Sequence, residues 1–238
     1  MSICTLVLDR INTDAYPVLH IRTVCHRREF CCNSAEILLY RVRESSIAAR
    51  FRRYMVNPKY REDKAAQVAA LFLSLRGGSM SKIKLIKLLY IIEREALIKW
   101  RRPVIFDRYV SMNKGPVVST TLNIINGDER ESTGPWDEAI SRPDENYRVR
   151  LISDPGTGKL SDAEEELIKD VYRRYGNMNR WRLCEHTHGF PEWTDPQNSS
   201  IPIKYEDILA GAGKTDIEIA AIVEEIENIA LMDEYFGQ

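Results

Sequence analysis

The residues whose types and spacing best suit metal or acid–base chemistry form one short run, Cys184-Glu185-His186-Thr187-His188. On a helix, Cys184 and His188 are four residues apart and share a face, where a thiolate and an imidazole could both bind a metal ion. Only two ligands are evident, whereas protein zinc sites use three or four. Alternatively, the run ends a helix, where a histidine interacts favourably with the negative end of the helix dipole. We favour this second interpretation.

Two glycine–lysine segments are similar to loops that bind phosphate groups. Residues 156–159 (GTGK) are followed by Leu160 rather than by Ser or Thr, and residues 211–215 (GAGKT) have Ile208 where the full motif needs its first glycine. Neither segment follows the buried hydrophobic strand that a phosphate loop requires. We therefore interpret both as turns and helix caps rather than as nucleotide sites.

A third candidate site combines histidines and cysteines near the N-terminus: His20, Cys25, His26, Cys31 and Cys32. The set contains no C-x-x-C pair, and the adjacent cysteines have poor chelate geometry. The chain also lacks G-x-S-x-G and H-E-x-x-H motifs. The acidic residues at 162–166 fall in a predicted first helical turn, where they complement the dipole. We expect no metal site, no cofactor and no enzymatic activity.

The elements that must position these residues are mostly helical. Hydrophobic periodicity predicts a mainly α (α+β) fold, a compact helical bundle around a buried central helix with a small two-stranded antiparallel β element. The central helix is predicted over 82–100, begins after Ser81 and is apolar nearly all round. Capping boxes at Ser161 and Thr215 predict two later helix starts. The other helices are expected at 61–75, 161–175, 179–186, 205–209 and 215–235.

The strands and loops are less clearly marked. Segments 106–113 and 147–153 have strand character, and we expect them to pair. Between them, residues 114–117 (KGPV) predict a turn that leads into a helix with Pro116 at its first position. Two polar loops, 128–146 and 189–202, contain Trp136 and Trp193. We interpret Trp136 as a possible interface anchor, and the alternative is that both tryptophans close the edge of the core.

A sharp change in composition near Met55 predicts a domain boundary. Residues 1–54 contain nine Arg, no Lys, five acidic residues and four of the five Cys, whereas residues 55–238 contain 25 basic and 30 acidic residues. Three interpretations of 1–54 remain open: an accessory segment, a basic arm that binds nucleic acid, or an Arg/Cys-rich extension that is either disordered or not translated. The composition favours the third, with Met55 as the true start.

The overall composition narrows the class of protein. The 238 residues have a net charge of −1, which argues against a protein that coats nucleic acid, so we expect no nucleic-acid partner except through residues 1–54. No apolar run approaches the 18 residues or so of a transmembrane helix, and the N-terminus reaches Asp9 without the pattern of a signal peptide. We expect a cytoplasmic protein with no membrane partner.

An ordered set of motifs goes beyond composition. Residues 84–90 read Lys-Leu-x-Lys-Leu-Leu-Tyr. Three motifs follow in order: Gly115-Pro116-Val117, Thr187-His188 and, a few residues later, Trp193. This set resembles the Panacea domain, also called the SocA-like antitoxin or phage-associated GepA-like family, over roughly residues 60–210. Where the family usually has an aromatic, a Lys and an aromatic before Gly-Pro, this chain has Met112, Asn113 and Lys114.

The resemblance implies an antitoxin of a bacterial or prophage toxin–antitoxin system, one that binds and neutralises a toxin encoded next to it. It also implies a domain without catalysis, extending over 55–238 with its C-terminal helix. The alternatives are an adaptor that delivers the toxin to a AAA+ protease, a phage-associated interaction protein, or a DNA-binding autoregulator that uses residues 1–54. The positions that match family motifs, with a role in the fold or in toxin contact, are Lys87, Leu88, Tyr90, Gly115, Pro116, His188 and Trp193.

Overall fold

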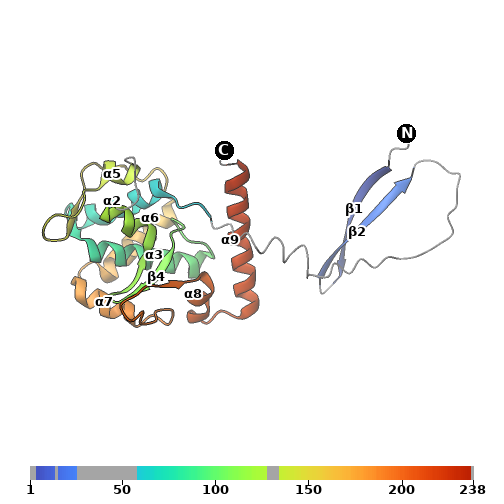
Figure 1. The fold of residues 1–238 in the computed structure, drawn as a ribbon. Helices are drawn as coiled ribbons and strands as arrows, with labels where there is room; N and C mark the ends of the chain where they lie inside the picture. The colour runs from blue at the N-terminus through green and yellow to red at the C-terminus, as the bar shows by residue number, and fades with distance from the viewer. Residues whose placement is uncertain (1–3, 14–15, 26–57, 128–133, 237–238) are drawn as a thin grey trace. The chain divides into compact units, whose positions relative to one another are not determined.

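The computed structural model describes residues 4–13, 16–25, 58–127 and 134–236, and the chain divides into two units, 1–50 and 51–238 (Figure 1). In the first unit, β1 (Cys4–Thr13) and β2 (Tyr16–Cys25) form an antiparallel hairpin with Cys4 opposite Cys25. The sequence did not predict this hairpin. His26, Cys31 and Cys32 lie outside the described residues, so the interpretations of 1–54 stay predictions.

The second unit is a helical domain, as the sequence predicted, with a small amount of antiparallel sheet. Its central helix has the predicted bounds, and twelve of its nineteen residues are buried. The helices are α2 (Glu62–Leu75), α3 (Lys82–Trp100), α4 (Ser119–Asn126), α5 (Pro135–Ala139), α6 (Asp162–Tyr175), α7 (Arg180–His188), α8 (Tyr205–Gly211) and α9 (Asp216–Phe236).

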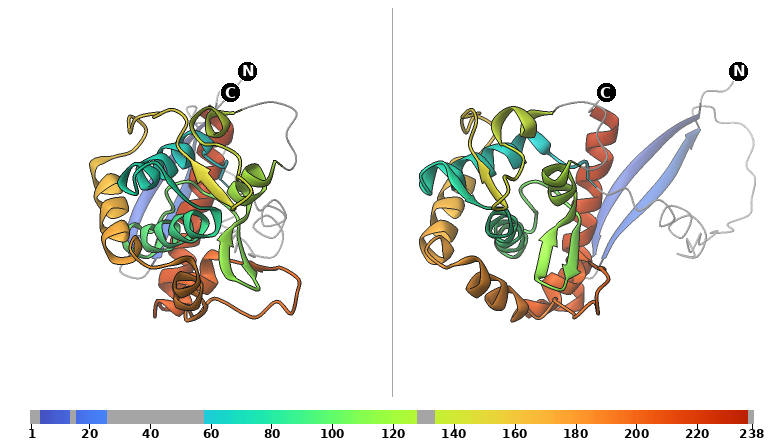
Figure 2. Two further views of the ribbon diagram at one scale, coloured as in Figure 1. Left: turned by 90° about the vertical axis from the view of Figure 1, so that its left-hand side faces the viewer. Right: turned by 60° about the vertical axis from the view of Figure 1, so that its left-hand side comes forward.

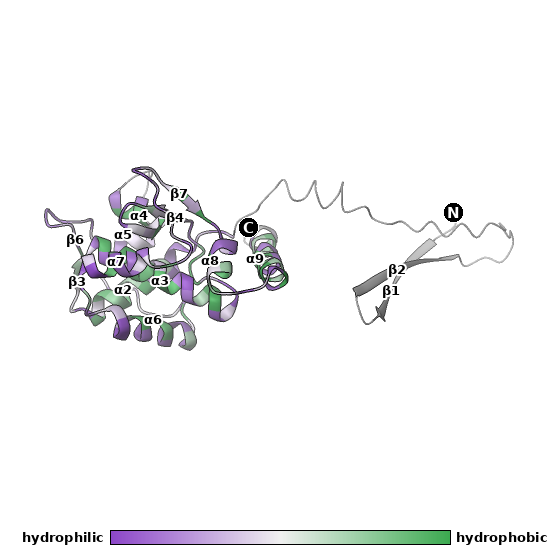
Figure 3. Ribbon diagram, turned by 90° about the horizontal axis from the view of Figure 1, so that it is seen from below, coloured by the Kyte–Doolittle hydropathy of each residue, from purple (hydrophilic) through white to green (hydrophobic). Residues whose placement is uncertain are grey.

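The buried helix α3 organises the core. It contacts α2, α4, α6, α7, α8 and the strand β5 (Gly115–Val118), and the two views of Figure 2 agree that these elements surround it. The outer helices are amphipathic: in Figure 3, α2 and α6 alternate between hydrophobic and hydrophilic stretches, as expected of helices with one buried face. Among the described residues, no helix combines the length and the apolar character that a membrane span requires.

Both predicted capping boxes are confirmed. The Ser161 N–H donates to Glu164 Oε2 at 2.8 Å while Ser161 Oγ accepts from the Glu164 N–H at 3.3 Å. Thr215 and Glu218 make the same reciprocal pair at 2.9 and 3.3 Å. These caps satisfy backbone N–H groups that a helix start leaves without intrahelical partners.

The strand pairing that we predicted between 106–113 and 147–153 is wrong. β6 (Arg148–Arg150) pairs with β3 (Ser79–Ser81), whereas β4 (Tyr109–Met112) lies at the centre of a three-stranded sheet in the order β5-β4-β7, with β7 at Ile201–Ile203. The turn before Gly115 folds β5 directly back on β4 as a hairpin. Since β7 takes the other edge of β4, no edge is left for residues 147–153.

The predicted helix start at Pro116 is also wrong, because Pro116 lies in β5 opposite Ser111. The helix α4 begins three residues later at Ser119. Its start is capped from a distant position: Asp107 accepts from the Thr120 N–H at 2.7 Å and from the Thr121 N–H at 2.9 Å. Pro116 is tolerated in β5 because this strand is at an edge of the sheet, where one N–H is dispensable.

Candidate functional site

Five of the seven family-motif residues meet where the β4–β5 hairpin packs between α3 and α7. We call this cluster the motif junction; its members are Lys87, Gly115, Pro116, His188 and Trp193. Lys87 Nζ donates to the Pro116 carbonyl at 2.6 Å, and Trp193 Nε1 donates to the carbonyl of Met112 at 3.1 Å. The His188 and Trp193 rings stack with centroids 4.3 Å apart. The motifs thus share one location although 106 positions separate the first from the last.

Position 115 requires glycine, because the β4–β5 hairpin lies very close to α3 and α7. Its φ of +92° lies in the region that favours glycine. A Cβ on Gly115 would lie 2.6 Å from Thr187 Oγ1 and 2.9 Å from Lys87 Nζ, closer than van der Waals contact allows. The hairpin can therefore approach α7 only with glycine at this position.

Lys87 is buried, and its amine is less basic than that of an ordinary lysine. Its side chain is 1 % exposed, and burial lowers the pKa from 10.5 to about 7, against a smaller opposing effect of Cys184. Among the described residues it makes one hydrogen bond, to Pro116, and no ion pair with a carboxylate. A lysine with a pKa near neutrality could act as a base or nucleophile. This one is almost fully buried, and its amine is occupied by the Pro116 carbonyl.

The Cys184–His188 pair does not form a metal site with a third ligand. Within the described residues, no three His, Cys, Asp or Glu side chains are grouped so that they could hold a metal ion. Burial raises the pKa of the Cys184 thiol and lowers that of the His188 imidazole, which Lys87 lowers further. His188 Nε2 is buried and has no hydrogen-bond partner within the described part of the chain. The raised pKa of Cys184 opposes the thiolate that a metal would need.

The two remaining motif residues, Leu88 and Tyr90, lie on α3, the helix that also carries Lys87. Tyr90 donates its hydroxyl proton to Glu192 Oε1 at 2.9 Å, and Arg94 Nε donates to the same oxygen at 2.6 Å. Burial and the neighbouring Glu192 raise the pKa of Tyr90. These bonds tie α3 to the residue directly before Trp193. Leu88 is fully buried in the core and contributes packing.

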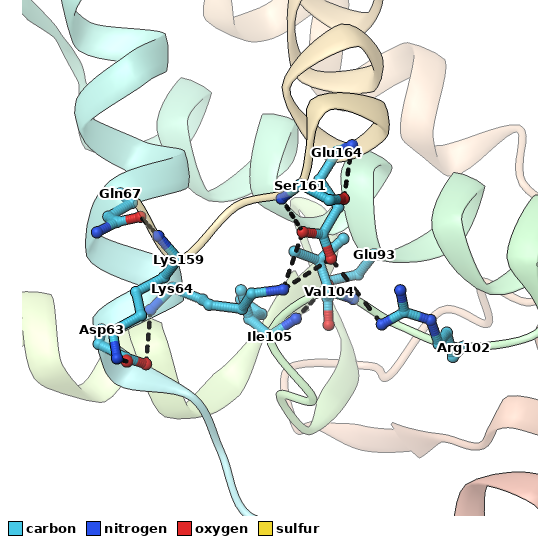
Figure 4. Close-up of polar contacts among 10 residues, drawn as sticks. All are labelled: Asp63, Lys64, Gln67, Glu93, Arg102, Val104, Ile105, Lys159, Ser161 and Glu164. Atoms are coloured by element: carbon cyan, nitrogen blue, oxygen red, sulfur yellow. Dashed lines mark hydrogen bonds and ion pairs between the residues drawn. The ribbon is translucent and has the colours of Figure 1, made fainter. Parts of the chain in front are cut away.

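Two further carboxylates are buried near α3, and their partners explain both (Figure 4). Glu93 accepts from the Val104 and Ile105 N–H groups at 2.8 and 2.9 Å and from the Tyr109 hydroxyl at 3.0 Å; burial nevertheless raises its pKa to about 7. For Glu164, burial acts upward on the pKa, but Lys64 at 2.7 Å and Ser161 outweigh it and hold the pKa below its ordinary value.

Trp136 does not fit the role of interface anchor that we predicted for it. Its side chain is 1 % exposed and belongs to the hydrophobic core, where α5 packs on α2. Its backbone N–H donates to Glu62 Oε1 at 3.1 Å. The alternative interpretation, that this tryptophan closes the edge of the core, agrees with the structure.

An exposed tryptophan that was not predicted from the sequence lies beside the motif junction. Trp181, in the first turn of α7, is 50 % exposed and lies between two cations: Lys114 Nζ is 5.6 Å and the Arg180 guanidinium 5.0 Å from its ring centroid. Lys114 also lines a cavity of about 400 Å³ together with Lys82 and Lys87, and no acidic side chain lines that cavity. The arginines on either side of Trp181 in the sequence were the available signal.

One of the comparisons with known proteins found a match. Residues 85–194 match the family described as "Antitoxin SocA-like, Panacea domain". The matched span contains all seven motif residues and ends before α8 and α9. No curated protein and no solved structure matches the chain. Residues 85–194 of this chain are therefore similar to the Panacea domain of the SocA-like antitoxin family, which confirms the resemblance that the motifs suggested.

Proposed function

We propose that this protein is an antitoxin that neutralises a cognate protein toxin, encoded next to it, by direct binding. The observation that carries the proposal is the match of residues 85–194 to the SocA-like antitoxin family. Five of the seven motif residues within the matched span lie together at the junction. In this proposal they hold the β4–β5 hairpin and α7 in place, and the partner binds an exposed surface of the domain that they support.

The chemistry of the buried groups supports binding rather than catalysis. Lys87 and Glu93 have the pKa values near 7 that acid–base catalysis would use. Both are nevertheless closed off from solvent and occupied by internal hydrogen bonds, Lys87 with Pro116 and Glu93 with two backbone N–H groups. A general base has to come within hydrogen-bond reach of its substrate. We therefore propose a non-enzymatic protein; that it acts in the cytoplasm is proposed from the family match alone.

Growth rescue tests this function. The adjacent open reading frame is expressed from an inducible promoter, and the full chain from a second promoter. We expect the neighbour alone to stop growth and the full chain to restore it. Expression of residues 55–238 alone shows whether residues 1–54 contribute. A neighbour that is harmless, or a toxic neighbour that the full chain does not counteract, would contradict the proposal.

The same pair of proteins separates direct neutralisation from delivery to a protease. A neutraliser inhibits the purified toxin in a mixture of the two proteins alone. An adaptor protects cells only while its AAA+ protease is present, so rescue would be lost in a strain that lacks the protease. We expect inhibition in the purified mixture.

A further inference from the structure

The end of α9 carries an unusual concentration of exposed apolar side chains. Half of the large apolar residues that are exposed in the described part of the chain belong to this helix: Ile217, Leu231, Met232, Tyr235 and Phe236. Tyr235 is 80 % exposed and Phe236 78 %. Soluble proteins seldom leave such a group uncovered unless a partner binds it. We call Leu231, Met232, Tyr235 and Phe236 the α9 tip.

Helix geometry arranges the tip as one surface. Residues four apart are neighbours on a helix, so Leu231 lies beside Tyr235 and Met232 beside Phe236 in adjacent rows. Leu231 and Tyr235 lie opposite the buried row of Ile222 and Ile226, whereas Phe236 continues that row beyond its last buried residue. Figures 1 and 2 show α9 as one long helix along a side of the domain. The tip is therefore displayed on a regular element whose other face is fixed.

The charge of α9 indicates what kind of surface would cover the tip. Residues 216–238 contain seven acidic residues and no Lys or Arg, whereas residues 55–215 contain 25 basic and 23 acidic residues. Glu225 pairs with Arg101 at 3.0 Å and Asp233 with Arg61 at 3.6 Å. Glu224 and Glu227 are exposed and make no ion pair with any described residue. The tip thus continues an acidic helix whose charge is only partly neutralised.

We propose that the α9 tip is the docking surface for the toxin, and that it inserts into an apolar groove bordered by lysines and arginines. The inference rests on the proposed antitoxin function and adds the chemistry of the partner. Aromatic side chains on one face of a helix are typical anchors for a groove, and the acidic face selects a basic rim. A second copy of this chain is a less suitable partner for the tip, because two paired α9 helices would bring like charges together.

Alanine substitution at the tip tests the docking surface. The full chain and the product of the adjacent open reading frame are purified, and their dissociation constant is measured by calorimetry. We expect Tyr235→Ala and Phe236→Ala each to weaken binding about tenfold or more. Ile152→Ala is the matched control, since Ile152 is 63 % exposed and far from α9 in the sequence. Its dissociation constant should stay within about twofold of the unaltered chain.

A charge reversal tests the basic rim. Glu224→Lys should slow association several-fold at low ionic strength, and the association rate of the unaltered chain should fall as salt is added. Circular dichroism verifies that the variants fold, which we expect because the substituted side chains are exposed. An association rate that is indifferent to both salt and Glu224→Lys would overturn the basic groove.

The outcomes separate this inference from the function on which it rests. If the unaltered chain does not bind the neighbour's product, the antitoxin proposal and this inference both fail. If it binds and the two tip variants bind equally well, only the inference fails. Self-association of the full chain that Phe236→Ala abolishes, with toxin binding unchanged, would assign the tip to a second copy and overturn the inference.

Discussion

Replacing Glu93 with glutamine should remove one specific pH dependence of folding stability. The folded state raises the pKa of Glu93 from 4.5 to about 7, chiefly by burial. Between these values the folded protein holds a proton that the unfolded chain has released. Stability contributed by this group therefore falls as the pH rises from 4.5 to 7. The displacement corresponds to about 3 kcal/mol, the amount by which the ionised carboxylate disfavours folding above pH 7.

Glutamine suits this test because it has the shape of glutamate and can keep the hydrogen bonds. Its Oε1 can accept from the Val104 and Ile105 N–H groups, and its Nε2 can donate to the Tyr109 hydroxyl oxygen. The free energy of unfolding is measured by urea denaturation with tryptophan fluorescence from pH 4.5 to 8. We expect the unaltered protein to lose about 3 kcal/mol relative to Glu93→Gln over this range.

Glu164→Gln is the matched control, because folding shifts the pKa of Glu164 in the opposite direction. The folded pKa of Glu164 is below its ordinary value, so its contribution to stability is complete above pH 4.5 and is lost only as the pH falls lower. The difference in unfolding free energy between this variant and the unaltered protein should stay flat from pH 5 to 8. Equal slopes for Glu93→Gln and the unaltered protein would refute the assignment of a raised pKa to Glu93.

Three other perturbations test the junction and the tryptophans. Gly115→Ala should lower the free energy of unfolding by about 2 kcal/mol or more, measured by thermal denaturation, because of the positive φ and the 2.6 Å approach to Thr187; an unchanged melting temperature would contradict the close packing. In the unaltered protein, stability should rise between pH 7 and 10, because in this range unfolded Lys87 is protonated whereas buried Lys87 has lost its proton at about pH 7. Lys87→Met should remove this rise. Urea denaturation at pH 7 and at pH 10 tests this. Trp136→Ala should cost about 3–5 kcal/mol in the same assay, and half-exposed Trp181→Ala less than about 1 kcal/mol; similar losses for both would show that their burial does not differ.

Local signals in the sequence predicted local structure well. The bounds of α3 follow from an apolar sequence that ends near Pro103, and the capping boxes at Ser161 and Thr215 involve residues only three apart. The residues of the motif junction could be identified from the sequence, but their proximity in the fold could not. The junction's hydrogen bonds join residues 29 and 81 positions apart in the chain, and no periodic pattern encodes such contacts.

Strand pairing and side-chain burial were harder to predict, because both depend on which distant segments pack against a given residue. Strand character in 147–153 was recognised, but β3, its partner, is three residues long and carries no signal of its own. Trp136 and Trp181 both have charged neighbours in the sequence, yet one is buried and the other exposed. On α9, Ile222 and Ile226 are buried, whereas Ile217 is exposed because it lies on the opposite face of the helix.

The long reach of the α3 contacts bears on how the protein folds during its synthesis. Tyr90 bonds to a partner 102 positions later, and Lys64 to one 100 positions later. While the ribosome is still translating the middle of the message, α2 and α3 have already emerged but lack the later elements that cover them. Their apolar surface stays uncovered until α6, α7 and Trp193 follow. The fold thus closes late, and a nascent chain interrupted before Trp193 leaves the core of the domain open.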